Sequence, residues 1–285
     1  MRGSWANAQE AIRLAQRYAA VTPTARRHAD LFDGVERFAM FVGYPRSGHS
    51  LVGALLDAHP EAAIAHEASA LQYVAARFDR DRLFTVLLEN SASYGAGRQP
   101  RGGYVYDVPG QWQGRFQRLR VIGDKKGEGA ALRLHGWPWV LARLRQTVGV
   151  PLRVLHVVRN PFDNVATMAR RAAEVSGRAV DLDASIGRYG ALCESAAAVR
   201  QRVGPEEWVE LRHEDLVARP ATELHTLCGA LGLEAPEGYL AACAGVVRAT
   251  PHQSRHKVAW TPGQRDAVAE LVDRFEPLSG YTFEA

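Results

Sequence analysis

Short apolar runs recur along the chain, separated by longer segments of mixed polarity. The runs predict five strands, at residues 38–42, 62–65, 119–122, 152–158 and 208–211. The run from Leu152 to Val158 is almost entirely apolar, which is typical of a central strand that is buried on both faces. It therefore marks the expected middle of a sheet.

The segments between these runs have the apolar spacing of helices. Predicted helices cover residues 5–20, 51–59, 83–88, 137–148, 183–202 and 221–231. The first is expected to end before the Thr22–Pro23 break and to pack outside the main sheet. Residues 91–103 are expected to form a loop, and the aromatic, glycine-punctuated segment 104–115 a rim or lid on the substrate side. Alternation of strands and helices predicts an α/β fold with a central, mostly parallel sheet, helices on both faces, and ligands outside the carboxyl ends of the strands.

Length and composition favour one globular domain. The 285 residues suit a single α/β domain, with residues 1–36 as a helical extension and a core from about 38 to 280. The composition, 47% apolar and 23% charged, excludes a disordered chain. No apolar run approaches the ~20 residues of a membrane span, and the start lacks a signal peptide, so we expect a cytoplasmic protein without a membrane partner. Cys193, Cys228 and Cys243 form no CxxC pair, which predicts buried, reduced thiols.

The charge pattern indicates an anionic ligand. A net charge of +4 is too small for a surface that coats nucleic acid, so no nucleic-acid partner is expected. Lysine occurs only as Lys125, Lys126 and Lys257, while arginine supplies all the other basic side chains. Genomic bias is one explanation, but an ammonium is a compact charge and a proton donor that arginine does not copy, so each lysine is a candidate site residue.

The turn after the first strand is a candidate anion site. It reads GYPRSGHS from Gly43 to Ser50 and leads into a predicted helix, whose first N–H groups and dipole favour a phosphate. The Walker motif GxxxxGK[ST] is absent, and Arg46 would supply the cation that its lysine normally gives. Taken alone, the octapeptide favours an ordinary strand-to-helix turn.

A second candidate anion site follows the central strand. Arg159 ends that strand, Asn160 is placed to cap the next helix, and Pro161 to begin it. Arg159 and Thr167 are expected to hold one phosphate together; the alternative is a surface arginine that pairs with Asp163. Arginine stands where a Walker B aspartate would bind Mg²⁺, so magnesium-dependent phosphoryl transfer loses support.

Four segments, in order along the chain, resemble motifs of one enzyme family. FVGYPRSGHSLVGALLDAHPE looks like a 5′-phosphosulfate loop, and LHVVRNPFDNVATMARR like a 3′-phosphate motif. VELRHEDLVARP is similar to an LRYEDL-type segment, and SRHKVAWTPGQ to a C-terminal element that closes over the nucleotide. The family is the sulfotransferases that use 3′-phosphoadenosine 5′-phosphosulfate (PAPS). The resemblance implies a P-loop-like fold, release of 3′-phosphoadenosine 5′-phosphate (PAP), a hydroxyl acceptor and no metal.

The style of the motifs is closest to the tyrosylprotein and carbohydrate branch, which implies that Glu67 is the catalytic base. Placement agrees, because residue 67 follows the strand expected beside the phosphate loop. The alternative is a carboxylate paired with a nearby arginine. His66 is the rival base, since an unperturbed imidazole pKa of about 6.5 suits proton abstraction near neutral pH.

The resemblance also implies the remaining site residues. The family's lysine lies in a segment that here reads VIGDKKGEG, so Lys125 is expected to stabilise the leaving phosphate, with Lys126 facing solvent; a solvated turn is the alternative for both. Arg46 would hold the 5′-phosphate with donors from Ser47, Gly48, His49 and Ser50. The expected nucleotide ligands beyond the loop are Arg159, Thr167, His213, Ser254, Arg255 and Lys257. His49 and His213 replace the usual threonine and tyrosine, which puts the adenine contact at residue 213 in doubt.

Two rival functions remain open, and the acceptor is not defined. The rivals are a magnesium-dependent kinase or NTPase on the same sheet, and a non-catalytic nucleotide-binding module. A small-molecule, sugar or peptide hydroxyl is compatible with the sequence. The aromatic residues expected either to line an acceptor pocket or to be core are Tyr94, Tyr104, Tyr106, Trp112, Trp137 and Trp139.

Overall fold

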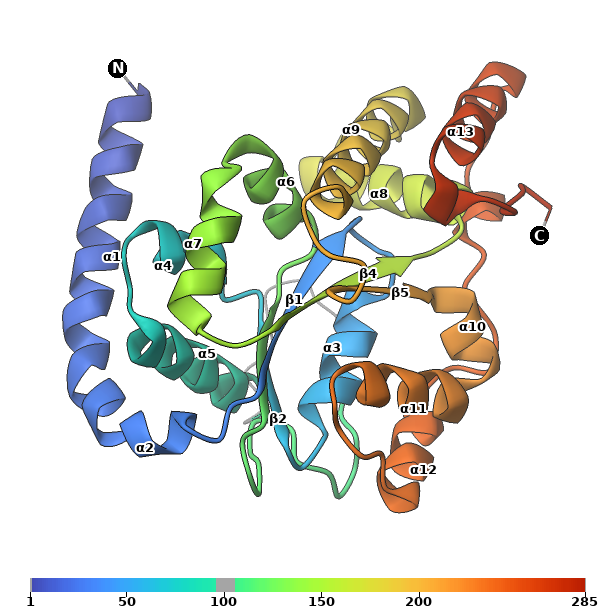
Figure 1. The fold of residues 1–285 in the computed structure, drawn as a ribbon. Coiled ribbons are helices and arrows are strands. Elements are labelled where there is room, and N and C mark those ends of the chain that lie inside the picture. The colour runs from blue at the N-terminus through green and yellow to red at the C-terminus, as the bar shows by residue number, and fades with distance from the viewer. Residues whose placement is uncertain (1, 96–105, 285) are drawn as a thin grey trace.

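Five parallel strands form one sheet in the computed structural model, which describes residues 2–95 and 106–284. The spatial order is β2-β3-β1-β4-β5, with bounds β1 (Arg37–Gly43), β2 (Ala62–His66), β3 (Val121–Lys125), β4 (Leu152–Val158) and β5 (Trp208–Arg212). Every neighbouring pair is parallel, and helices cover both faces of the sheet (Figure 1). The predicted α/β class is confirmed. The strand predicted at 119–122 lies at 121–125 instead, which moves Asp124 and Lys125 from a turn into the sheet.

The two faces of the sheet have separate cores. Phe38, Met40 and Val42 of β1 point to one face and Ala39 and Phe41 to the other, as the two-residue period of a strand requires. The first face packs against α1 (Arg2–Arg27), α2 (Ala29–Phe32), α4 (Ala70–Ala75), α5 (Arg80–Gly95), α6 (Glu128–Gly136) and α7 (Trp139–Val148). The second packs against α3 (His49–Asp57), α10 (His213–Ala218), α11 (Pro220–Ala230) and α12 (Glu237–Val246).

A third apolar cluster lies beyond the carboxyl end of β4. It joins α8 (Pro161–Ser176), α9 (Leu182–Arg200) and α13 (Pro262–Arg274) to the C-terminal segment, which contains the short helices η1 (Ser254–Lys257) and η2 (Glu276–Leu278). The predicted cap of α8 is present, because the Asn160 side chain accepts from the N–H of Phe162. The capping box of Thr261 and Gln264 also forms at the start of α13. These caps fix the segments that frame the carboxyl edge of the sheet.

Two helix boundaries differ from the prediction. The first helix does not end before Pro23 but continues to Arg27. Val21 and Ala25, on either side of Pro23, are buried in the core, and this packing stabilises the continuous helix. Residues 91–95, predicted as loop, extend α5, and the buried Ser91 hydroxyl donates to Asp57 of α3. The remainder of the predicted loop, residues 96–103, is outside the described residues, as is Tyr104.

Two further predictions concern the state of the cysteines and the presence of membrane-spanning helices. Cys193, Cys228 and Cys243 are buried and free of disulfides, as predicted. Across residues 2–95 and 106–284, no helix has both the length and the apolar character of a bilayer span.

Candidate active site

The turn between β1 and α3 is pressed against α10. Arg46 and Gly48 both have left-handed backbones, with φ of 67° and 102°. A Cβ at Gly48 would lie 2.6 Å from Nδ1 of His213, so glycine is required both by its φ and by the close approach. The phosphate-loop motif and the HEDL motif, far apart in sequence, therefore meet at the carboxyl edge of the sheet.

Side chains inside the turn hold its shape. The buried Ser47 hydroxyl donates to Tyr44 O at 2.9 Å, and Asn164 of α8 donates to Pro45 O at 2.8 Å. The His49 ring points into the core, 3.1 Å from Val42 O, and burial lowers its pKa to about 3. With their side chains turned inward, Ser47 and His49 can offer a ligand only their backbone N–H groups. The N–H of His49 lies in the first turn of α3, which leaves it without an intrahelical partner.

Lys125 ends β3 with its ammonium inside the site. Its side chain is only 3% exposed, which rules out a solvated turn. The Nζ atom donates to Ser50 Oγ at 3.1 Å and to Glu67 Oε1 at 3.1 Å. Burial lowers the pKa of this lysine, while the neighbouring carboxylate works against that shift. Lys125 thus connects the phosphate-loop helix to Glu67.

Glu67 follows β2 and is bound by two lysines. Lys125 contacts Oε1, and the Lys126 ammonium lies 3.5 Å from Oε2, so the partners are lysines and not the arginine considered from the sequence. Burial alone would raise the pKa of Glu67, but Lys125 and then Lys126 bring it below its ordinary value. Half of the side chain is exposed, with a relative accessibility of 51%. The carboxylate is therefore ionised at neutral pH and accessible to a proton donor.

His66 lies beside this ion pair. It is opposite Lys125 in the β2–β3 register, and its Nε2 is 3.4 Å from the ammonium. Its ring stacks on Tyr94 of α5, with centroids 4.1 Å apart. Burial and then the lysine charge lower its pKa to about 4, so the imidazole is neutral near pH 7.

Arg159, at the end of β4, connects two segments of the site. The side chain is buried; Nη1 donates to Arg46 O at 3.1 Å and Nη2 to His252 O. Its Nη2 is 4.0 Å from Asp163, so the pairing considered from the sequence is at most a distant one. The Nε atom has no hydrogen-bond partner among the described residues. A buried guanidinium N–H without a partner favours a ligand that brings an acceptor.

Hydroxyl and basic groups surround this arginine. Thr167 Oγ1 lies 2.8 Å from Ser254 Oγ, which is 2.8 Å from His252 Nδ1. Lys257 Nζ is 2.9 Å from His252 Nε2. Because an ammonium only donates, Nε2 accepts and Nδ1 donates to Ser254. His252 had no signal in the sequence, since a lone histidine in a loop has no motif.

Arg255 and His213 complete the predicted set. Arg255 is buried, and its Nη1 donates to Asp163 Oδ2 at 2.7 Å, so the guanidinium is held by α8. His213 begins α10; burial and then Arg159 lower its pKa to about 4, and Nδ1 has no partner in the described part of the chain. The cations, the hydroxyls and the unmatched Nε of Arg159 and Nδ1 of His213 suit a polyanionic ligand with polar ring atoms, such as a phosphorylated nucleotide.

The predicted aromatic wall is not assembled as a unit. Tyr94 lies at the site because its ring stacks on His66. The backbone N–H of Trp112, in contrast, donates to Ala58 O, at the far end of α3 from the phosphate loop. This contact places Trp112 away from the phosphate loop, and its predicted role, pocket wall or core, stays a prediction. Trp137 and Trp139 are exposed and stack on each other, 6.4 Å between centroids.

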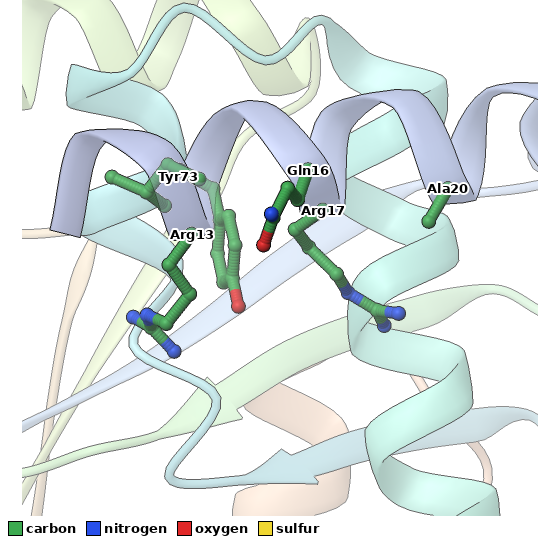
Figure 2. A pocket seen from close by; sticks show the side chains of 6 residues that line it. Arg13, Gln16, Arg17, Ala20 and Tyr73 are labelled. Atoms are coloured by element: carbon green, nitrogen blue, oxygen red, sulfur yellow. The ribbon is translucent and has the colours of Figure 1, made fainter. Parts of the chain in front are cut away.

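A cavity elsewhere does not coincide with this site. It has a volume of about 360 Å³ and lies between α1 and α4, as Figure 2 shows. Its basic side chains are already paired, Arg13 with Glu10 and Arg17 with Glu89. None of the carboxyl-edge residues lines it; the lining residues are Arg13, Leu14, Gln16, Arg17, Ala20 and Tyr73.

Comparison with known proteins agrees with the geometry. Residues 152–237 match the family model described as "Sulfotransferase family". The sulfotransferase domain of the Synechococcus PCC 7002 olefin synthase is similar in fold, with a TM-score of 0.54 at 15% identity over 85% of this chain and 94% of that domain. Sulfotransferase STF9 from Mycobacterium avium has a TM-score of 0.51 at 12% identity, over 92% of this chain and 81% of its own. None of the curated proteins matches the chain.

The fold is that of an α/β protein, and the residues at the carboxyl edge of its sheet form a candidate anion site. The match to the sulfotransferase family model covers residues 152–237, and the described residues have the fold of solved sulfotransferases. The resemblance to sulfotransferases is thereby confirmed in the matched segment and in the fold, which is the P-loop-like one that the resemblance implied. The kinase alternative gains no support from either comparison.

Proposed function

We propose that the carboxyl edge of the sheet transfers a sulfuryl group from PAPS to the hydroxyl of a small-molecule, sugar or peptide acceptor. The observation that carries the proposal is the position of Lys125. Its ammonium contacts both Ser50, in the first turn of the phosphate-loop helix, and the Glu67 carboxylate. A cation between an anion cradle and an ionised carboxylate is the arrangement that in-line transfer from a phosphosulfate to a hydroxyl needs.

The proposed chemistry assigns one task to each group. PAPS, when bound, supplies the sulfuryl group. Glu67 takes the proton of the acceptor hydroxyl as its oxygen bonds to sulfur and the bond from sulfur to the 5′-phosphate oxygen breaks. Lys125 and Arg46 stabilise the negative charge that appears on that phosphate oxygen. Fixed cations and N–H groups supply the stabilisation, so we propose transfer without a metal ion.

The nucleotide is assigned to the groups around Arg159. Arg159, Thr167, Ser254 and Lys257 would hold the 3′-phosphate, and Ser47, Gly48, His49 and Ser50 the 5′-phosphate. The partnerless, buried Nε of Arg159 supports this assignment, because a phosphate oxygen would satisfy it. His213, whose Nδ1 also lacks a partner, is proposed to contact another polar part of the nucleotide. Arg255 is proposed to contribute by holding its loop against Asp163 of α8.

The domain organisation and location are proposed on the same basis. We infer one domain over residues 1–285, since Val21 of α1 and Phe32 of α2 share a core with β1. A cytoplasmic location, without nucleic-acid or membrane partners, is proposed from the composition and the mild net charge of +4.

Calorimetric titration tests the nucleotide site. PAP, 5′-AMP and ATP are compared in EDTA and again with Mg²⁺. We expect PAP to bind in EDTA and 5′-AMP to bind much more weakly, because it lacks the 3′-phosphate. A preference for ATP that appears only with Mg²⁺ would overturn the proposal and favour a kinase.

Transfer itself is tested by PAP release from PAPS. The panel of acceptors contains a phenol, a monosaccharide, a tyrosine peptide and a sterol, with water as the reference acceptor. Glu67→Gln is compared with His66→Asn in the same assay. Loss of turnover in Glu67→Gln alone supports Glu67 as the base, whereas loss in His66→Asn alone assigns the base to His66. A protein that binds PAP but accelerates no release with any acceptor is a binding module.

A further inference from the structure

The turn that carries Glu67 has an unfavourable backbone. Glu67 and Ser69 have φ of 57° and 67°, in the left-handed region that side chains other than glycine rarely adopt. Such conformations persist only where surrounding contacts hold them, and they gather at functional sites. Some group must therefore hold the turn from 67 to 70, which leads from β2 into α4.

Asp124 supplies the contacts that hold it. Its Oδ1 accepts from the N–H of Ala68 at 2.9 Å, and its Oδ2 from the N–H of Ala70 at 2.7 Å. The residue is 2% exposed, so both bonds are shielded from water. Each carboxylate oxygen thus fixes one peptide on either side of Ser69, directly after Glu67.

Neighbouring residues of β3 act on this turn from opposite faces of the sheet. Successive side chains of a strand point to opposite faces. Lys125 packs against α3, where a Cβ at Gly53 would lie 2.9 Å from its Cγ. Asp124 lies on the other face with Met40 and Ala130. In addition, the N–H of Glu67 donates to Lys125 O at 3.1 Å. One strand end thereby fixes both the backbone of the turn and the carboxylate of Glu67.

We propose that Asp124 is a positioning residue for Glu67: it holds the turn from 67 to 70 so that the carboxylate lies between Lys125 and Lys126. Asp124 itself is buried behind the turn, and its carboxylate bonds to the backbone of the turn. The inference rests on the role of Glu67 given in the proposed function. Asparagine at this position keeps one acceptor oxygen but turns an NH₂ group toward the other N–H, so one of the two bonds is lost and two donors face each other.

The test is a double-mutant cycle with a matched control. Asp124→Asn, Glu67→Gln and the double variant are compared in PAP release from PAPS with the acceptor that the panel selects, or with water. The control is Asp57→Asn: Asp57 is also a buried carboxylate, accepting from the N–H groups of Ile64 and Gly114, but at the far end of α3. We expect Asp124→Asn to lower kcat about 10- to 100-fold, the range that misplacement of a reacting group produces, with the Kd of PAP changed less than threefold.

The pattern of the cycle decides the outcome. If Asp124 acts through Glu67, the double variant has the activity of Glu67→Gln alone, whereas Asp57→Asn combines with Glu67→Gln multiplicatively. A multiplicative Asp124 effect, or a parallel loss of PAP affinity, overturns the positioning role while leaving Glu67 as the base. Full activity of Glu67→Gln instead refutes the proposed function's base, and the positioning role with it.

Amide hydrogen exchange provides a readout that does not depend on turnover. The N–H groups of Ala68 and Ala70 are expected to exchange faster in Asp124→Asn and at the wild-type rate in Asp57→Asn. Unchanged exchange at both amides would refute the proposal. If Asp124→Asn does not fold, the comparison is repeated in a Ser69→Gly background, because glycine adopts the left-handed φ without strain.

Discussion

The Lys125 ammonium lies 3.1 Å from Glu67 Oε1 and 3.1 Å from Ser50 Oγ, and its side chain is almost fully buried. The contact joins the ends of β3 and β2 to the start of α3. In a site of low polarity, a fixed cation stabilises developing negative charge without reorganising solvent. The ion pair therefore serves two functions before any substrate arrives: it keeps Glu67 ionised, and it holds the ammonium beside the phosphate loop.

Replacement of this lysine is expected to affect turnover far more than binding. Lys125→Ala should lower kcat about 10²- to 10³-fold, the usual effect of removing one preorganised donor, with the Kd of PAP within about tenfold of wild type. Lys126→Ala is the matched control, because Lys126 is more exposed and lies 3.5 Å from Glu67. Single-turnover PAP release and PAP titration measure the two effects. Equal losses of kcat in Lys125→Ala and Lys126→Ala would contradict a role in turnover that is specific to Lys125.

The pH dependence of kcat/KM is expected to report the same ion pair. A general base is active when deprotonated, so activity falls as the pH drops through its pKa. In the wild type, Lys125 and Lys126 outweigh burial and keep the pKa of Glu67 below its ordinary value, which places the acid limb at low pH. In Lys125→Ala the largest lowering influence is gone while burial still raises the pKa, so the limb should move to higher pH. pH–rate profiles of both proteins would refute Glu67 as the base if the limb stayed in place or moved down.

Recognition of the 3′-phosphate is expected to depend on Thr167. Thr167→Val removes the hydroxyl beside Ser254 without changing the shape of the side chain. A hydrogen bond to a charged group contributes about 1.5–3 kcal/mol, so PAP should bind about 10- to 100-fold more weakly. Binding of 5′-AMP should not change. Thr226→Val is the control, since the Thr226 hydroxyl donates to Thr222 O in its own helix, α11. Equal weakening of PAP and 5′-AMP would show that Thr167 does not read the 3′-phosphate.

The sequence predicts the part of this fold that depends on local pattern. The buried strand from Leu152 to Val158 and the Asn160 cap each rest on neighbouring residues, and both are confirmed. The predicted end of the first helix before Pro23 is wrong, because the local rule that proline breaks a helix does not include the long-range packing of Val21 and Ala25. Short helices such as α10 are too brief to show a period.

The candidate site shows the same division between local and long-range information. Motif positions placed Lys125, Glu67 and Arg159 at strand ends, and the structure brings them to one edge of the sheet. The expectation that the strand before Glu67 lies beside the phosphate-loop strand is wrong, because β3 lies between β2 and β1. The contacts of His252 and Asp124 depend instead on segments that meet only in three dimensions. The contact of Trp112 with Ala58 is of the same kind, because composition does not show that its loop returns to the far end of α3.

Substitution of Arg255 distinguishes a structural role of this residue from a ligand-binding role. Its guanidinium lies 2.7 Å from the Asp163 carboxylate, and both side chains are at most 2% exposed. The backbone N–H of Arg255 donates to the same carboxylate. Removing one partner of a buried pair leaves an uncompensated charge, so Arg255→Met should lower the free energy of unfolding by about 3–5 kcal/mol.

Urea unfolding of the nucleotide-free protein measures this change. Arg274→Met is the matched control: its pair with Glu194 is exposed, and such pairs contribute about 0–1 kcal/mol. In Arg255→Met combined with Asp163→Asn the buried charge is gone from both sides, so part of the stability should return. If Arg255→Met unfolds like the wild type but loses PAP affinity, Arg255 binds the nucleotide directly and the pair with Asp163 contributes little to the fold.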